Sequence, residues 1–386
     1  MKDKLIQLYK QRFNKSPDKF FTSPCRINII GEHTDYNGGL ALPAAISRYI
    51  CAVVGKRDDR KIFLKSLDKT KEILIDVDQI KNKKENYWCN YPLGIFKTLQ
   101  NRGVDIPFGL NIIFDSNAPI ASGLSSSAAL LDLTGFIAST MYGLDLSNKD
   151  IALLAHQSET EFNGLQCGVM DEMAIALGKK DKCILLDCKT NDYQYIDLKI
   201  DRKIKLVVIV SNVKRQLVHS PYNTRVEECQ EGLRLIKEHF NIESLSDINV
   251  SDLPMVRNII KDDVIYKRVK HVVTENERVR QFVEAFKDHD SPKIISLINE
   301  SHESLRDDYE VTGEYLDYIH ELALKYGAFA SRMTGAGFGG SSIAAIREKE
   351  FPTFKDSIMR DYYARFKIKP LVFIADISDG LTVEEI

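Results

Sequence analysis

The stretch SPCRINIIGEHTDYNGG, residues 23–39, predicts a strand that ends in a polar loop. Successive side chains of a strand point to opposite faces, so Arg26 and Asn28 would share one face of a strand over Arg26–Ile30. The chain then turns at Gly31 and presents four polar side chains close together: Glu32, His33, Asp35 and Tyr36. Carboxylates and an imidazole on such a loop can hydrogen-bond a polyhydroxylated ligand, with a solvated charged turn as the alternative.

The segment NAPIASGLSSSAA, residues 117–129, predicts an anion site. A β-run ends before it and a helix begins within it, so unpaired backbone N–H groups and the positive end of the helix dipole would meet there. Its small side chains would let phosphate oxygens approach the backbone, and its serine hydroxyls add donors and a magnesium ligand. The segment lacks the lysine of a GxxxxGK[ST] loop, and simple helix capping is the alternative.

Two further segments carry chemistry. MTGAGFGGSS, residues 333–342, sets four glycines between β-like runs, which permits close approach of the backbone to a ligand or, alternatively, a hairpin crossing. In ETEFNGLQCGVMDE, residues 159–172, Asp171 follows apolar residues. It could act as a general base or as the N-cap of the short helix that follows.

Length and composition indicate two domains and exclude two classes of partner. The chain has 386 residues, more than one ordinary domain of about 150 to 200 residues. It carries 53 basic and 55 acidic residues, so there is no global basic field for nucleic acid or an anionic membrane. The seven cysteines are scattered without a CxxC pair, and no apolar run has the length of a signal peptide or a membrane span. We therefore expect a cytoplasmic protein with reduced thiols.

Hydrophobic patterning predicts an α+β fold of two lobes. Short β-rich runs dominate the first half and precede helices expected over 127–142 and 150–162. The second half opens with more strand-like runs and becomes mostly helical, with an apolar stripe at three- and four-residue spacing across 265–286. We expect an N-terminal domain at 1–195 and a C-terminal domain at 196–386, whose last segment could return to the first domain.

Taken together, these segments resemble the galactokinase family, within the superfamily of small-molecule kinases that also includes homoserine kinase, mevalonate kinase and phosphomevalonate kinase. RINIIGEHTDYNGG is similar to the signature of that family, GLSSSAA to its phosphate-binding motif, and MTGAGFGG to its third motif. RVKHVVTENERV and ESHESLRDDYEVTG resemble its helical C-terminal half. The resemblance covers nearly the whole chain and implies mixed sheets with helices in two lobes, with the active site in the cleft between them.

The resemblance also implies residue roles. Asp171 corresponds to the catalytic aspartate of the family, and Arg26 to the arginine beside it. Residues that would bind the sugar are Glu32, His33, Asp35, Asp171, Tyr222 and Ala336. Residues that would bind ATP are Gly123, Leu124, Ser125, Ser126 and Ser127 around the phosphates, and Trp88 and Tyr91 near adenine. Ser127 and Glu159 would hold Mg²⁺. For the two aromatic residues, a place in the hydrophobic core is the default alternative.

The resemblance predicts ATP-dependent phosphorylation of the anomeric hydroxyl of galactose by a monomer or weak homo-oligomer. Cys25, Glu172 and Val226 stand where the family usually has Gly, Gln and Arg. Glu172 would add a negative charge beside Asp171, which could raise the pKa of that base. Two alternatives are a kinase for a related sugar, such as N-acetylgalactosamine or arabinose, and a sensor that binds galactose and ATP without catalysis.

Overall fold

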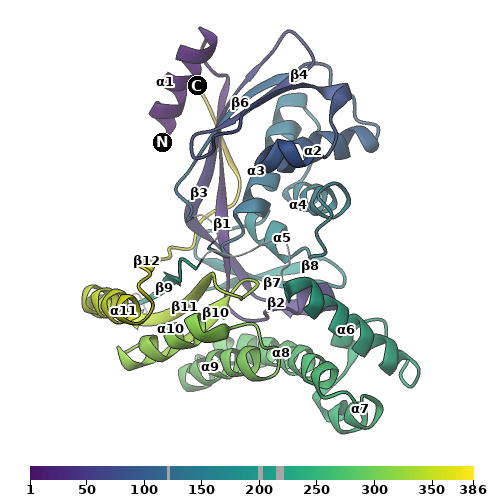
Figure 1. The fold of residues 1–386 in the computed structure, drawn as a ribbon, viewed down its shortest axis with the longest axis vertical. Coiled ribbons are helices and arrows are strands. Elements are labelled where there is room, and N and C mark those ends of the chain that lie inside the picture. Colours follow the sequence, from purple (N-terminus) through teal and green to yellow (C-terminus); the bar gives the residue numbers. More distant parts are fainter. Residues whose placement is uncertain (120–121, 199–202, 214–220) are drawn as a thin grey trace.

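The chain forms two lobes, each built on its own β-sheet, with a small third sheet between them (Figure 1). The computed structural model describes residues 1–119, 122–198, 203–213 and 221–386. In spatial order, the six strands of the upper sheet are β13 (Thr382–Glu385), β1 (Lys19–Asn28), β3 (Pro43–Lys56), β6 (Leu110–Ser116), β4 (Lys61–Ser66) and β5 (Ile73–Asp76). All neighbours in this sheet are antiparallel except the parallel pair β4 and β6.

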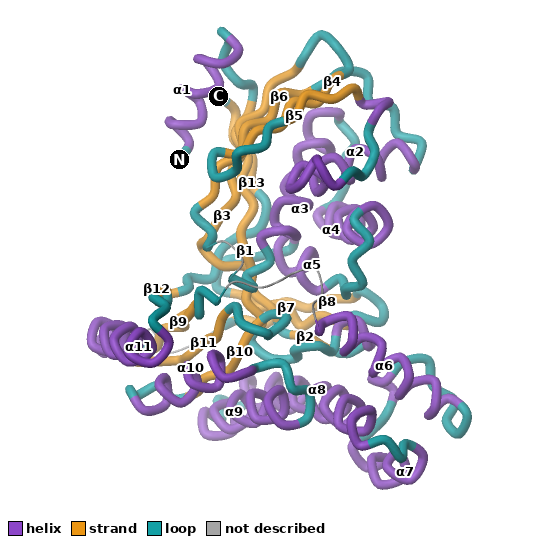
Figure 2. The backbone as a smooth tube through the Cα atoms, viewed as in Figure 1, coloured by secondary structure: helices purple, strands orange, loops and turns teal. Residues whose placement is uncertain are grey.

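Side-chain alternation gives the upper sheet two apolar faces. Phe21 on β1 belongs to the core beneath α2 (Asn90–Asn101) and α3 (Ser126–Tyr142), whereas Phe20 packs with residues of α1 (Lys2–Phe13) on the opposite face. Figure 2 shows α1 on one side of this sheet and α2 and α3 on the other. Two further helices pack on α3, namely α4 (Asn148–Gln157) and α5 (Met170–Ala176).

The lower lobe is a four-stranded sheet with most of the helices. Its strands in spatial order are β10 (Ala330–Thr334), β11 (Ser341–Arg347), β9 (Ile204–Val210) and β12 (Leu371–Ile374). Its helices are α6 (Pro221–Lys237), α7 (Leu253–Ile259), α8 (Asp263–Lys287), α9 (Ser291–Asp307), α10 (Gly313–Lys325) and α11 (Phe351–Phe366). On β9, Val207 and Ile209 face the core shared with α10 and α11.

A separate apolar cluster joins the lobes. Val208 and Val210, on the other face of β9, pack in one cluster with Ile27, at the lower end of β1, and Ile29, just after that strand. The small sheet of β2 (Leu40–Ala41), β7 (Lys182–Asp187) and β8 (Asp192–Asp197) lies beside this junction. The polar loop after β1 is therefore anchored between the two lobes.

The structure confirms the α+β class and modifies several predicted boundaries. The strand predicted at 26–30 begins at Lys19, because residues 19–22 already pair with both β3 and β13. The helix predicted over 150–162 is α-helical to Gln157 and continues as a π-helix, Ser158–Phe162. The C-terminal strand β13 returns to the first lobe. A domain boundary at 195 falls near the end of β8 and stays a prediction.

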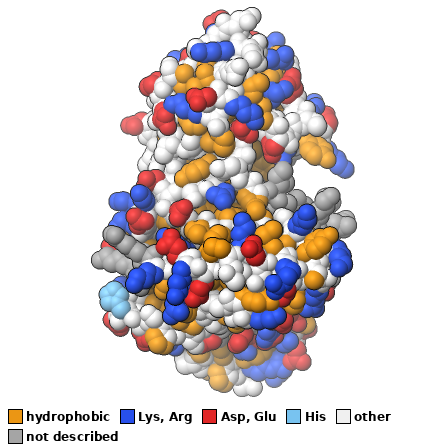
Figure 3. Space-filling view, turned by 90° about the vertical axis from the view of Figure 1, so that its left-hand side faces the viewer, with side chains coloured by type: hydrophobic (Ala, Val, Ile, Leu, Met, Phe, Trp, Pro, Cys, Tyr) orange, Lys and Arg blue, Asp and Glu red, His pale blue; other side chains and the backbone are white. Residues whose placement is uncertain are grey.

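The surface agrees with the near-neutral charge. On the face drawn in Figure 3, basic and acidic side chains are interspersed over both lobes. None of the helices in the described part of the chain combines the length and the apolar character that crossing a bilayer requires.

Candidate active site

Asp171 and Arg26 form an ion pair at the centre of the molecule. The Oδ1 of Asp171 accepts a hydrogen bond from Nε of Arg26 at 2.7 Å, and Oδ2 accepts one from Nη2 at 2.9 Å. The Arg26 side chain is 4% exposed and that of Asp171 is 30% exposed. The helix α5 begins at Met170 with Val169 as its N-cap, so Asp171 lies in the first turn and is not the cap. Its carboxylate therefore remains available to a ligand while Arg26 fixes its orientation.

The serine-rich segment lies directly against this pair. Arg26 Nη1 donates to the carbonyl of Gly123 at 2.7 Å, and the Ser125 hydroxyl donates to Asp171. Ser125 is the N-cap of α3 and has a left-handed φ of 57°. The N-terminus of α3 with its free N–H groups thus faces the same point as the carboxylate. Ile120 and Ala121 of this segment lie outside the described residues.

The glycine-rich segment packs on the serine-rich segment. Gly335 has a φ of 85°, and a Cβ at this position would lie 2.6 Å from the carbonyl oxygen of Gly123. Only glycine permits both this backbone conformation and this approach. Ala336 follows it and is partly exposed. Four segments that are distant in the sequence therefore meet at Asp171 or next to it.

Glu32 is held by a partner that the sequence analysis missed. Its side chain is buried and forms an ion pair with Arg332, a fully buried arginine that also donates to the carbonyl of Asn28 at 2.9 Å. Burial raises the pKa of Glu32, and the charges of Arg332 and Arg26 counteract that rise. The only local signal for Arg332 was its place directly before MTGAGFGG.

A second carboxylate, also missed, fixes the backbone of the polar loop. Glu275 on α8 is fully buried, and its Oε1 accepts hydrogen bonds from the backbone N–H of Gly31 at 3.0 Å and from the Ser301 hydroxyl at 2.6 Å. Arg278 donates to its Oε2 at 2.7 Å. Burial alone would raise the pKa of Glu275, but the charge of Arg278 helps to lower it to about 2. Its place in RVKHVVTENERV was the available signal.

Aromatic rings line the polar loop on the side of α6. His33 Nδ1 and the Tyr36 hydroxyl are 2.9 Å apart, and the Tyr36 hydroxyl is 2.7 Å from that of Tyr309. The Tyr222 ring lies 5.7 Å from that of His33 and 5.5 Å from that of Tyr36. Burial lowers the pKa of His33 well below its usual value, so the imidazole is neutral. Tyr36, which the sequence already places on the polar loop, and Tyr309, which it did not indicate, complete a wall with His33 and Tyr222.

Asp35 faces Asp171 across the site. Burial, followed by the charge of Asp171, raises the pKa of Asp35 to about 7. Gly168 lies against it so closely that a Cβ there would collide with the Asp35 carboxylate. The glycine before α5 thus lets the loop that carries Asp35 approach the segment that carries Asp171.

Three more carboxyl groups lie behind Asp171. Glu159, Glu172 and Asp132 are all buried, and within the described residues none forms an ion pair with a lysine or an arginine. Burial raises the pKa of each group, that of Glu172 to about 8. Buried carboxyl groups without a cationic side chain suit a bound cation, which would favour their ionised forms. Glu159 and the hydroxyl of Ser127, in the first turn of α3, therefore fit the donor set that Mg²⁺ prefers.

Trp88 and Tyr91 lie at the N-terminal end of α2. Trp88 is 8% exposed, donates its indole N–H to the carbonyl of Lys71 at 3.0 Å, and packs edge-on against Phe114 in the upper core. Tyr91 is partly buried at the start of α2. Burial, followed by the charge of Glu159, raises the pKa of Tyr91. A contact of this pair with adenine stays a prediction.

The two-lobed fold, with a carboxylate fixed between a serine-rich helix start and a polar loop, defines a small-molecule kinase of the GHMP class. Models described as the GHMP kinases N terminal domain and the GHMP kinases C terminal match residues 90–179 and 282–364, and the galactokinase galactose-binding signature matches residues 7–56. Curated galactokinases are similar over nearly the full length. That of Clostridium beijerinckii is 39% identical over 376 residues, 96% of each chain, and that of Fusobacterium nucleatum is 38% identical over 385 residues, 98% of this chain and 99% of its own.

Comparison with solved structures leads to the same family. The crystal structure of Lactococcus lactis galactokinase complexed with galactose has a TM-score of 0.95 to this chain at 34% identity, covering 98% of this chain and 99% of that one. Mevalonate kinase from Methanococcus jannaschii has a TM-score of 0.67 at 21% identity, covering 94% of this chain and 99% of that one, which shows a common fold. The chain belongs to the galactokinase family, and it is a kinase.

Proposed function

We propose that this kinase transfers the γ-phosphoryl group of ATP to the anomeric hydroxyl of galactose and releases galactose 1-phosphate and ADP. The observation that carries the proposal is the position of the Asp171 carboxylate, which is bound by Arg26 and by Ser125 of the serine-rich segment and faces Asp35 of the polar loop. A group at this junction can contact a sugar on one side and a phosphate on the other.

Galactose would bind at the polar loop. Asp35 and the buried Glu32 offer carboxylate acceptors for ring hydroxyls, and the neutral imidazole of His33 can exchange a further hydrogen bond. Tyr222 would contact the sugar from the aromatic side, and Ala336 from the glycine-rich segment. This assignment is supported by the likeness to a galactokinase whose crystal structure holds galactose.

Asp171 would orient the anomeric hydroxyl and accept its proton as the new bond between that oxygen and the γ-phosphorus forms and the bond from the γ-phosphorus to ADP breaks. Arg26 would keep the carboxylate in place and stabilise negative charge on the transferred group. Transition states of phosphoryl transfer are loose, so positioning by these two residues matters more than full deprotonation before attack.

The ATP phosphates would be held by backbone N–H groups of Gly123, Leu124, Ser125 and Ser126 at the start of α3, and the base would lie near Trp88 and Tyr91. Ser127 and Glu159 would hold Mg²⁺. When bound, that ion neutralises charge on the β- and γ-phosphates. The free thiols of all seven cysteines support a reducing, cytoplasmic location, and we propose a monomer or weak homo-oligomer.

The test is ADP release by the purified chain with ATP and Mg²⁺, compared without sugar and with galactose, N-acetylgalactosamine or arabinose. We expect kcat/KM to be highest with galactose. A higher value on another of these sugars would reassign the substrate, and galactose binding without sugar-dependent ADP release would indicate a sensor.

Asp171→Asn tests the role of the carboxylate. The near-isosteric amide cannot accept the proton, so we expect kcat to fall by about 10² to 10⁴ while galactose binding is largely kept. Asp356→Asn, at an exposed position of α11, is the matched control and should turn over normally. Wild-type turnover of Asp171→Asn would exclude this residue as the base.

A further inference from the structure

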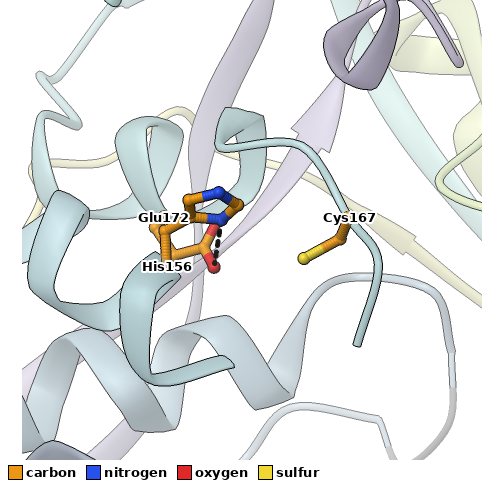
Figure 4. A group of neighbouring side chains, drawn as sticks. All are labelled: His156, Cys167 and Glu172. Carbon is orange, nitrogen blue, oxygen red and sulfur yellow. Dashed lines mark ion pairs between the residues drawn. The ribbon is translucent and has the colours of Figure 1, made fainter. Parts of the chain in front are cut away.

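We propose that His156, Cys167 and Glu172 form a binding site for a transition-metal dication, and that Zn²⁺ is the ion that their donor atoms suit best. One ligand atom from each side chain lies within 4.8 Å of the other two. The three residues come from the last turn of α4, the loop before α5 and the first turn of α5. Figure 4 shows the imidazole beside the carboxylate, with the sulfur of Cys167 directed toward both.

The strongest evidence is the state of Glu172. Its side chain is 0% exposed, and apart from the neighbouring carboxyl group of Glu159, neither carboxylate oxygen has a hydrogen-bond partner among the described residues. The Nδ1 of His156 is also buried without a hydrogen bond in the described part of the chain, and it lies 3.8 Å from Oε1 of Glu172, too far for one. Buried polar groups almost always have partners, since an unpaired one costs free energy. A cation among these groups would satisfy the carboxylate and the imidazole together.

The local backbone is unusual at this position. The α-helix α4 ends at Gln157, directly after His156, and continues as a π-helix over Ser158–Phe162. Single π-turns are rare and are frequent at functional sites. The same turn carries Glu159, whose Oε2 accepts a hydrogen bond from the Cys167 thiol at 3.4 Å. The proposed site therefore shares a border with the Mg²⁺ site proposed above but has different ligands.

The donor atoms select the ion. A ring nitrogen, a thiolate sulfur and a carboxylate oxygen are a typical set for Zn²⁺, whereas Mg²⁺ takes oxygen ligands in a strict octahedron. Three protein ligands leave a fourth position for water, as in open zinc sites. Because the three ligands tie the loop before α5 to α4, occupancy would fix the segment that leads into Asp171.

The experiment uses the full-length chain after treatment with a chelator, in a large excess of Mg²⁺, with Co²⁺ as a spectroscopic probe for Zn²⁺. We expect a single Co²⁺ to bind and to produce a thiolate-to-cobalt charge-transfer band, which Zn²⁺ removes by displacement. Cys167→Ser should abolish the band. Replacing a residue that only hydrogen-bonds a metal ligand typically lowers metal affinity by about 10- to 100-fold. Replacing a ligand itself, in His156→Gln or Glu172→Gln, should therefore weaken Zn²⁺ binding by about 100-fold or more in calorimetry.

Matched controls are Cys188→Ser, at the other partly exposed cysteine, and His239→Gln, at an exposed histidine, and both should keep the band. The proposal would be overturned if Mg²⁺ displaced the bound Co²⁺, or if all three ligand variants bound it as tightly as wild type. Either result would place the ion at Ser127 and Glu159. A wild-type chain that binds neither Co²⁺ nor Zn²⁺ would also overturn the proposal. If Cys167→Ser fails to fold, Glu172→Gln decides, because the amide has nearly the same shape and can still contact the carboxyl group of Glu159.

Discussion

Asp171 and Glu172 are neighbours in the first turn of α5 but have opposite surroundings. Asp171 receives two hydrogen bonds from Arg26 and one from Ser125. Glu172 is fully buried and forms no ion pair with a lysine or an arginine among the described residues, and burial raises its pKa to about 8. Successive helical residues point about 100° apart, so one turn can present one carboxylate to a cleft and the other to the interior. The carboxylate in the proposed catalytic role is thus the one provided with a cation.

Removing the positive charge of Arg26 should have the largest effect on the free energy of unfolding. In Arg26→Met the side-chain volume is nearly kept, but Asp171 and the carbonyl of Gly123 lose their shared donor. Breaking one side of a buried ion pair costs about 3 to 5 kcal/mol, which urea denaturation at pH 7 would measure. Arg280→Met, which removes an exposed pair within α8, should cost less than about 1 kcal/mol. Equal losses in the two variants would mean that Arg26 contributes no more than a surface charge.

Removing the ionisable group of Glu172 should have the opposite effect and stabilise the protein. The pKa of Glu172 is about 8 in the folded chain against an ordinary 4.5, so the folded state holds this proton more tightly. Stability is therefore lost as pH rises from about 4.5 through 8. Glu172→Gln, in metal-free protein, should be more stable than wild type by about 2 to 4 kcal/mol near pH 8, and the gain should shrink toward pH 5.

The measurement is urea denaturation of both proteins across that pH range. Glu227→Gln, at an exposed position of α6, is the control and should show no such trend. A Glu172→Gln variant that is less stable than wild type at pH 8 would show that Glu172 is paired in solution, and the contrast with Asp171 would fail.

Asp35 is intermediate between Asp171 and Glu172. It lies near Asp171, but among the described residues no arginine donates a hydrogen bond to it. Its pKa of about 7, against 3.8, means that its ionisation also removes stability as pH rises through that interval. Asp35→Asn should be more stable than wild type by about 1 to 3 kcal/mol at pH 8 and should lose most of that gain by pH 4. The same variant should raise the KM for galactose, since it replaces a charged acceptor.

Thermal unfolding at the two pH values and sugar kinetics together check Asp35. A stabilised variant with an unchanged KM would move the sugar away from the polar loop. A destabilised variant would mean that the carboxylate is needed for folding.

Local sequence was sufficient to predict the parts of the site that depend on short-range geometry. The alternation around Arg26 and the glycine-serine start of α3 are properties of a few residues: Arg26 pairs with Asp171 while its neighbour Ile27 lies in an apolar cluster, and α3 begins directly after Ser125. The resemblance to a family placed Asp171 beside Arg26, two residues 145 positions apart that no periodicity could join.

Features that depend on tertiary packing were missed. Arg332 is 300 positions from Glu32, and nothing in the residues around it indicates a fully buried charge. The π-helix at Ser158–Phe162 also had no signal in the local sequence. Trp88 shows the converse case, since its default assignment to the core matches its burial. Short motifs thus pointed to the groups that we propose to face the ligands, but not to the buried groups that hold those side chains in place.

The smallest expected effect concerns the second donor to Asp171. Ser125→Gly removes the hydroxyl but keeps the left-handed backbone of this N-cap, which glycine adopts without strain. Loss of one such hydrogen bond costs about 1 kcal/mol, so kcat/KM should fall about fivefold while thermal stability is kept or slightly raised. Turnover equal to wild type would mean that Arg26 alone orients the carboxylate. A loss of kcat/KM as large as that of Asp171→Asn would mean that the Ser125 hydroxyl itself contacts the transferred phosphoryl group. Ser125 would then have a catalytic role, as proposed for Arg26, in addition to orienting Asp171.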